Sequence, residues 1–247
     1  MIAQNAHYDE KMASVYEQMY PIGFDTDAAV EFLAGLVDPG ATVLELGIGT
    51  GRIAVPMTER GFKVSGVDAS EAMLAKLAER DTKNEITTVL GDFTQPSLDM
   101  GGGFDLVTLV LNTFFVAVSR EAQLNCLRNV RDQLAPGGRF VLEAFDPSPY
   151  HVLTKPDFSM RFLGENAIML DTLMVDRSQQ LMVATHTILD GGAPQTTQHV
   201  LRYAFPLEID LIAELAGLRL VERRAGWHKE PFTAISPRHV SVYERAK

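Results

Sequence analysis

Residues 42–52 read TVLELGIGTGR and decide the fold. An apolar run typical of a short strand, residues 42–46, passes directly into a turn with Gly47, Gly49 and Gly51. Such glycines let the backbone approach a ligand closely and present amide groups near the start of a helix. The segment therefore predicts a strand, a ligand-binding turn and a helix in succession.

The spacing of these glycines argues against two common phosphate loops. The dinucleotide fingerprint G-x-G-x-x-G would need a glycine at position 52, where the chain has Arg52. No G-x-x-x-x-G-K-[ST] sequence occurs either, which disfavours a nucleoside triphosphate site. The turn is predicted to hold a different kind of ligand.

Outward from this turn, apolar runs alternate with helical patterns, which is typical of βαβ units in a parallel sheet. The expected strands are 42–46, 62–67, 86–90, 104–111 and 139–145, followed after the cap by a helix at 207–216 and strands at 218–224 and 239–243. Helical periodicity disappears between residues 146 and 206, where 167–175, 180–189 and 195–205 read as an antiparallel meander. We expect one α/β domain with a small antiparallel β cap inserted after its fifth strand.

Composition excludes several kinds of partner. With 22 Lys and Arg against 32 Asp and Glu, the net charge of −10 lacks the basic footprint that nucleic acid requires. The single cysteine, Cys126, cannot form an internal disulfide, and the polar start resembles no signal peptide, so we expect a cytoplasmic protein. No run of apolar residues is long enough to span a membrane. The expected ligands are small molecules.

Carboxylates stand at the ends of three expected strands. Asp68 ends the second strand, where an acidic residue can accept both hydroxyls of a ribose. Asp92 follows the third strand and is placed to meet an adenine amino group, with Phe93 beside it as an apolar wall. Together with Glu45, these carboxylates would repel a di- or triphosphate and suit an adenosine ligand that carries an amino group and a sulfonium cation.

Five motifs in this order carry a family resemblance: ELGIGTG at 45–51, VDAS at 67–70, GDF at 91–93, FDLV at 104–107 and LAPGGRF at 134–140. Over residues 40–145 the chain resembles the class I S-adenosylmethionine-dependent methyltransferases. This resemblance implies a Rossmann-like seven-stranded sheet in the order 3-2-1-4-5-7-6, with strand seven antiparallel. It also implies S-adenosylmethionine as cofactor, S-adenosylhomocysteine as product and no metal.

The resemblance also assigns cofactor residues. It implies that Glu45 and Gly47 face the methionyl part, that Asp68 takes the ribose hydroxyls, and that Asn112 lies beside the transferable methyl group. The complete predicted cofactor set is Tyr8, Tyr16, Glu45, Gly47, Gly49, Gly51, Arg52, Asp68, Ala69, Asp92, Phe93 and Asn112.

A second resemblance lies at the ends of the chain, in HYD at 7–9, VYEQMYP at 15–21, LRYAF at 201–205, GW at 226–227 and SPR at 236–238. These segments are similar to small bacterial methyltransferases, some of which act on amines, including sugar amines. We expect an N-terminal helical lid over 1–30, a catalytic domain of 31–148 and 206–247, and a substrate cap of 149–205. Tyr8 and Tyr16 would close the lid, although ordinary packing explains them equally well.

Methyl transfer from a sulfonium needs alignment and a nucleophile in the right protonation state. Residues 111–119, LNTFFVAVS, hold no histidine or acid that could serve as a base, so nitrogen is the first acceptor expected, oxygen the second and carbon the third. No catalytic residue is assigned. Candidate substrate contacts are Phe115, His186, His199, Tyr203 and Trp227, each of which could instead be structural. A non-catalytic cofactor-binding protein and a monomer or homodimer both remain open.

Overall fold

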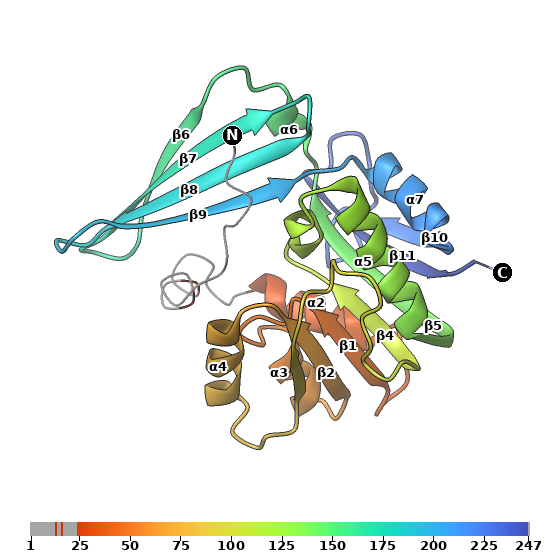
Figure 1. Ribbon diagram of the computed structural model, residues 1–247. Helices are drawn as coiled ribbons and strands as arrows, with labels where there is room; N and C mark the ends of the chain where they lie inside the picture. The colour runs from red at the N-terminus through yellow and green to blue at the C-terminus, as the bar shows by residue number, and fades with distance from the viewer. Residues whose placement is uncertain (1–12, 14–15, 17–23, 247) are drawn as a thin grey trace.

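The computed structural model describes residues 13, 16 and 24–246, and within them a seven-stranded sheet lies beside a separate four-stranded antiparallel sheet (Figure 1). Tyr8 and most of the expected lid lie outside the described residues. None of the helices in the described part has the length and hydropathy needed to cross a bilayer.

The large sheet and its helices follow the predicted α/β alternation. Its strands are β1 (Thr42–Leu46), β2 (Lys63–Asp68), β3 (Thr87–Leu90), β4 (Phe104–Leu109), β5 (Leu134–Phe145), β10 (Leu218–Arg224) and β11 (Arg238–Arg245). Its helices are α2 (Phe24–Ala34), α3 (Ala54–Glu59), α4 (Glu71–Arg80), the 3-10 turn η1 (Thr113–Val116), α5 (Arg120–Gln133) and α7 (Pro206–Leu215). The boundary expected at residue 30 falls inside α2.

The strand order is β3-β2-β1-β4-β5-β11-β10, with β11 antiparallel to both of its neighbours. This confirms the predicted order 3-2-1-4-5-7-6 with an antiparallel seventh strand. The order reverses between β1 and β4, which are parallel. In open α/β sheets, ligands bind at the carboxyl ends of strands beside such a reversal.

The central strands are buried on both faces, as their unbroken apolar sequences predict. Leu44 and Val107 pack into one core cluster with α5 and α7, whereas Val43 and Leu106 pack into a second cluster with α2 and α3. Neighbouring residues of one strand therefore anchor helices on opposite faces, and the carboxyl ends of β1 and β4 are held rigidly between two layers.

Two strand and helix limits differ from those expected. The helix predicted to follow the glycine turn begins only at Ala54, because Gly51 has a φ of 79° and still belongs to the turn. The strand expected to reach residue 111 ends at Leu109, because Leu111 and Asn112 have φ values of 55° and 62°. Both differences lie where the chain leaves the sheet for the predicted ligand site.

The cap contains four strands, whereas three are expected from the sequence: β6 (Asp157–Phe162), β7 (Ile168–Asp176), β8 (Leu181–Leu189) and β9 (Gln195–Arg202), preceded by α6 (Ser148–His151). The additional strand is β6, an edge strand whose six residues are all exposed. Figure 1 shows this sheet projecting away from the large sheet, with β9 on the side nearer the α/β domain and β6 on the far side.

Replacing Gly66 in the middle of β2 with alanine should destabilise the protein by about 1–3 kcal/mol. A Cβ atom there would lie 2.3 Å from Cδ1 and 2.7 Å from Cβ of Ile48, which stands between two glycines of the β1 turn. The matched control is Gly35→Ala, whose Cβ would approach nothing closer than the Glu31 carbonyl oxygen at 3.4 Å. Urea unfolding of both variants tests this, and equal stabilities would contradict it.

Candidate active site

The glycine turn after β1 is fixed by backbone hydrogen bonds to β2. The Gly47 and Ile48 amides both donate to the Val67 carbonyl, at 2.8 and 3.1 Å. Gly47 has a φ of 69°, and a Cβ atom on it would lie 2.5 Å from Cγ2 of Thr113 in η1. Glycine is therefore required both for the backbone conformation and for the close approach of η1.

Glu45, the last residue but one of β1, is a buried carboxylate that is 4% exposed. The Ala54 amide donates to its side chain, but Oε2 finds no hydrogen-bond partner among the described residues. Burial and the neighbouring charge of Asp68 raise its pKa to about 8. Because a buried acceptor without a donor is costly, this oxygen fits a ligand that brings a cation or an N–H group.

Asp68, at the end of β2, joins the glycine turn to the start of α4. Its Oδ2 accepts from the Gly49 amide at 2.8 Å, and its Oδ1 accepts from the Ser70 amide at 2.9 Å. Burial raises its pKa, while these backbone hydrogen bonds oppose that shift. Each carboxylate oxygen retains a further lone pair, so Asp68 can still accept from ribose hydroxyls.

The segment after β3 places Asp92 and Phe93 differently. Asp92 is exposed, and its oxygens accept from Thr94 and Gln95 in its own loop. Phe93 is buried, and its Cε1 lies 3.5 Å from the position of a Cβ on Gly47. Phe93 is thus brought to the glycine turn, and the contact of Asp92 with adenine stays a prediction.

The segment after β4 is strained and held by β5. Leu111 and Asn112 both have left-handed backbones, which is unfavourable for leucine. The Leu111 amide donates to Oε2 of Glu143 at 2.9 Å, and Oδ1 of Asn112 accepts from the Phe145 amide at 2.7 Å. These two bonds fix the position at which Asn112 would meet the transferable methyl group.

Glu143 is a buried carboxylate beside the predicted site that sequence reasoning missed. It is buried, and burial raises its pKa, although the Leu111 amide and Arg238, whose Nη1 lies 3.5 Å from Oε1, oppose that shift. The Trp227 side chain also hydrogen-bonds to it. The signal was an acid inside the apolar run VLEAF at 141–145. Glu143 acts as a positioning residue for the loop after β4.

Three predicted substrate residues are buried in the core. Trp227 lies behind Glu143, edge-on to Phe32 with ring centroids 5.6 Å apart. Phe115 packs edge-on against Phe145 at 4.8 Å, and the Tyr203 hydroxyl lies 2.7 Å from Nδ1 of His151. Direct contact of Phe115, Tyr203 or Trp227 with a substrate stays a prediction.

The two remaining substrate candidates lie together on the cap. Nε2 of His186 is 3.4 Å from Nε2 of His199, and Nδ1 of His186 is 2.5 Å from Oδ1 of Asp171. Burial and the neighbouring His186 lower the pKa of His199 to about 4. On the same sheet face, Leu173, Met182 and Leu201 pack into the core cluster that contains η1 residues Phe114 and Phe115. The histidine pair therefore lies on the cap face turned toward the α/β domain.

The remaining predicted cofactor residues are less closely tied to this arrangement. Gly51 and Arg52 lie in the turn before α3, Ala69 is exposed beside Asp68, and Tyr16 is half-buried. The contacts above thus bring together Glu45, Gly47, Gly49, Asp68 and Phe93. Asn112 is the chain neighbour of Thr113, whose side chain lies next to Gly47. No group of three or more potential metal ligands occurs in the part of the chain that the structure describes.

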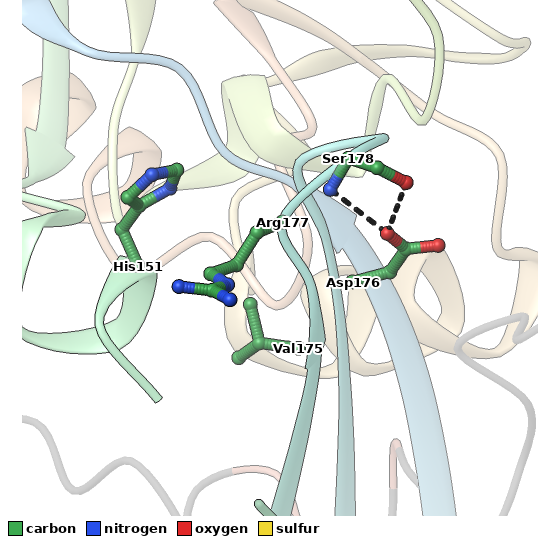
Figure 2. Close-up of a pocket in the computed structure, with 5 residues that line it drawn as sticks. All are labelled: His151, Val175, Asp176, Arg177 and Ser178. Atoms are coloured by element: carbon green, nitrogen blue, oxygen red, sulfur yellow. Dashed lines mark hydrogen bonds between the residues drawn. The ribbon is translucent and has the colours of Figure 1, made fainter. Parts of the chain in front are cut away.

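A pocket of about 620 Å³ lies at the base of the cap (Figure 2). His151 from the end of α6 faces Val175, Asp176, Arg177 and Ser178 from the end of β7 and the turn into β8. Asp176 is bonded to Ser178, and Arg177 projects between the hairpin and His151 (Figure 2). None of these lining residues belongs to the loops after β1, β2 or β3, so the pocket is separate from the predicted cofactor residues.

The fold and the turn define a Rossmann-like domain built to hold a nucleoside cofactor. Residues 43–138 match the methyltransferase domain family. Over 208 residues the chain is 33% identical to cypemycin N-terminal methyltransferase from a Streptomyces species, covering 83% of this chain and 84% of that protein. The chain belongs to the S-adenosylmethionine-dependent methyltransferases.

Solved structures agree with this assignment. The CcbJ methyltransferase from Streptomyces caelestis is 36% identical and superposes with a TM-score of 0.90 over 99% of this chain and 100% of that chain. CalS10, an amino pentose methyltransferase from Micromonospora echinaspora whose structure holds bound S-adenosylmethionine, has a TM-score of 0.72 over 94% of this chain and 95% of that chain. At 19% identity, the likeness to CalS10 shows the fold alone.

The residues present fit S-adenosylmethionine. The buried Glu45 oxygen suits the amino group of its methionyl part, Asp68 suits the ribose, and Gly47 and Gly49 allow close approach of the backbone. When bound, this cofactor supplies a methyl group already activated on a sulfonium. The protein's own residues must position the acceptor, exclude water and take up a proton.

We expect binding of S-adenosylhomocysteine to release a proton from Glu45. The carboxyl has a pKa of about 8 in the free chain, so it is mostly protonated at pH 7, and the ligand's amino group favours the ionised form. Affinity should rise by up to about tenfold per pH unit as the pH increases toward 8, and level off above it. Isothermal titration in buffers of different ionisation enthalpy measures the released proton.

For this test Glu45→Gln should abolish both the proton release and the pH slope. Glu59→Gln, at the exposed end of α3, is the matched control and should keep both. Wild-type binding without proton release would show that Glu45 does not face a cationic part of the ligand.

Replacing Asp68 with asparagine should weaken S-adenosylhomocysteine binding by about 1–3 kcal/mol, because an amide nitrogen cannot accept hydrogen bonds. Asp190→Asn is the control, since Oδ1 of Asp190 accepts from the Gly192 amide at 3.0 Å in the same local pattern, in a turn of the cap. Titration calorimetry compares the two variants. Equal affinities would mean that the ribose is bound elsewhere.

Proposed function

We propose that this methyltransferase N-methylates an amine on a small molecule. The observation that carries the proposal is the 33% identity, across 83% of the chain, to a protein named for methylation of an N-terminus. The acceptor of that relative is an amine, and nitrogen is also the atom that the predicted methyl position suits best.

The loop beside the predicted methyl position supports nitrogen on chemical grounds. Residues 111–119 contain asparagine, threonine, serine and apolar side chains but no histidine or carboxylate. An amine needs only to lose its own proton before attack, whereas a hydroxyl gains far more from an adjacent base. Glu143 is near this loop, but it is buried in β5 with one oxygen bonded to the Leu111 amide and the other 3.5 Å from Nη1 of Arg238, so we assign it a supporting role.

The histidine pair on the cap is the proposed proton acceptor. When Nδ1–H of His186 donates to Asp171, Nε2 of His186 is the basic atom of the pair, and it lies 3.4 Å from Nε2 of His199. A proton taken up there makes His186 an imidazolium, whose charge Asp171 balances. The ammonium of the substrate becomes a neutral amine, ready for in-line attack.

A panel of sugar amines, amino acids, a short peptide with a free N-terminus, phenols and alcohols should show turnover with amines. Accumulation of S-adenosylhomocysteine identifies the active acceptor, and mass spectrometry of the product identifies the methylated atom. Methylation of oxygen alone would contradict the proposal, methylation of the peptide would keep nitrogen but replace the small molecule, and no turnover with any acceptor would favour a binding protein.

With the active amine, His186→Gln should lower kcat by roughly tenfold to a hundredfold and steepen the dependence of rate on pH, because the amine must then lose its proton to solvent. His228→Gln is the matched control, because that histidine is exposed in the segment between β10 and β11. Equal effects of the two substitutions would show that the histidine pair takes no part in the reaction.

A further inference from the structure

The free edge of the cap sheet is unusually apolar for a surface strand. Within the described residues β6 pairs only with β7, and all six of its residues are exposed. Phe158 and Phe162 are 72% and 73% exposed, and Met160, Leu170 and Met174 on the same sheet face are exposed too. Edge strands are usually protected by charges, prolines or a covering segment, because an open edge can pair with another chain.

The backbone geometry shows which groups this edge presents. The Leu163 amide donates to the Ala167 carbonyl at 2.8 Å, so odd-numbered residues of β6 direct their backbone groups toward β7. The amide and carbonyl groups of Phe158, Met160 and Phe162 consequently face the open edge. An antiparallel partner strand must pair with these even-numbered residues.

The charges of β6 select the partner. Its face opposite the exposed apolar side chains carries Asp157, Ser159 and Arg161. If two β6 strands pair antiparallel about a two-fold axis at Ser159, Phe158 lies opposite Met160 of the second copy, which satisfies the backbone pattern. The same register places Asp157 opposite Arg161 of the second copy, and the reverse, so both cross-strand pairs have opposite charges.

Neighbouring registers lose this match. A two-fold axis at Arg161 or at Asp157 would place like charges directly opposite each other, which is destabilising. Axes at Phe158 or Met160 leave both charged residues without an opposite charge across the edge. The strand is therefore complementary to itself in one register, as a symmetric interface requires.

We propose that the protein forms a homodimer through antiparallel pairing of two β6 strands centred on Ser159, which joins the two caps into one continuous sheet. The pairing brings Phe158 and Met160 of the two copies together on one face. On the other face Arg161, whose Nε lies 3.6 Å from Oδ2 of Asp171, also meets Asp157 of the second copy. The partner is a second copy of this chain.

Charge reversal tests the register. In analytical ultracentrifugation of the full chain, the wild type should dimerise reversibly, and Asp157→Arg and Arg161→Asp should each weaken the dimer at least tenfold, because each places like charges opposite each other. An equimolar mixture of the two variants should regain dimers, because every opposed pair then has opposite charges. Monomeric wild type, unaffected single variants or a mixture that stays monomeric would each overturn the proposal.

A proline pair provides a second test that does not alter charge. Met160→Pro removes an outward-facing amide and leaves the β6–β7 bonds intact, so it should abolish dimers while S-adenosylhomocysteine binding is retained. The control is Gln198→Pro on β9, the other edge of the same sheet. The Tyr203 amide, just after β9, donates to the Gln180 carbonyl just before β8, so odd-numbered residues of β9 direct their backbone groups toward β8. The amide of the even-numbered Gln198 therefore points outward. Equal dimerisation of the two proline variants would place the interface elsewhere.

Discussion

The structure depends on the bonds that tie the glycine turn of β1 to the end of β2. The Val67 carbonyl accepts from two amides of the turn, and the Asp68 carboxylate accepts from the amides of Gly49 and of Ser70, which directly precedes α4. These hydrogen bonds satisfy backbone amides of the turn. Lone pairs of Asp68 and a buried oxygen of Glu45 remain able to accept from a ligand. The predicted cofactor residues are thus held by the sheet itself.

The segment after β4, the predicted acceptor side of the site, is held by hydrogen bonds to β5. The segment after β4 holds two residues in left-handed conformations, and it keeps that shape because Glu143 and Asn112 connect it to β5. Trp227 and Arg238 hold Glu143 from strands and loops near the end of the chain. Strain of this kind persists where the surroundings over-determine it, and it is common at functional sites. Residues near the C-terminal end of the chain therefore support the segment after β4 indirectly, through Glu143.

The sequence predicted the features that depend on neighbouring residues. Glycine spacing and the apolar central strands are local signals, and the structure confirms the fold that they imply. Features that depend on distant residues were missed: the bond between Glu143 and Leu111, the burial of Trp227 behind Glu143, and strand β6. Glu143 and Trp227 have partners that lie far away in the sequence. Strand β6 is an exposed edge, and its exposure is determined only when the sheet is assembled.

The most direct measurement is a crystal structure with S-adenosylhomocysteine bound. The account predicts the ribose hydroxyls on the Asp68 carboxylate, the amino group of the ligand within reach of Glu45, and the sulfur on the side of Asn112. A ligand whose ribose lies away from Asp68, or whose amino group leaves Glu45 buried without a partner, would contradict it.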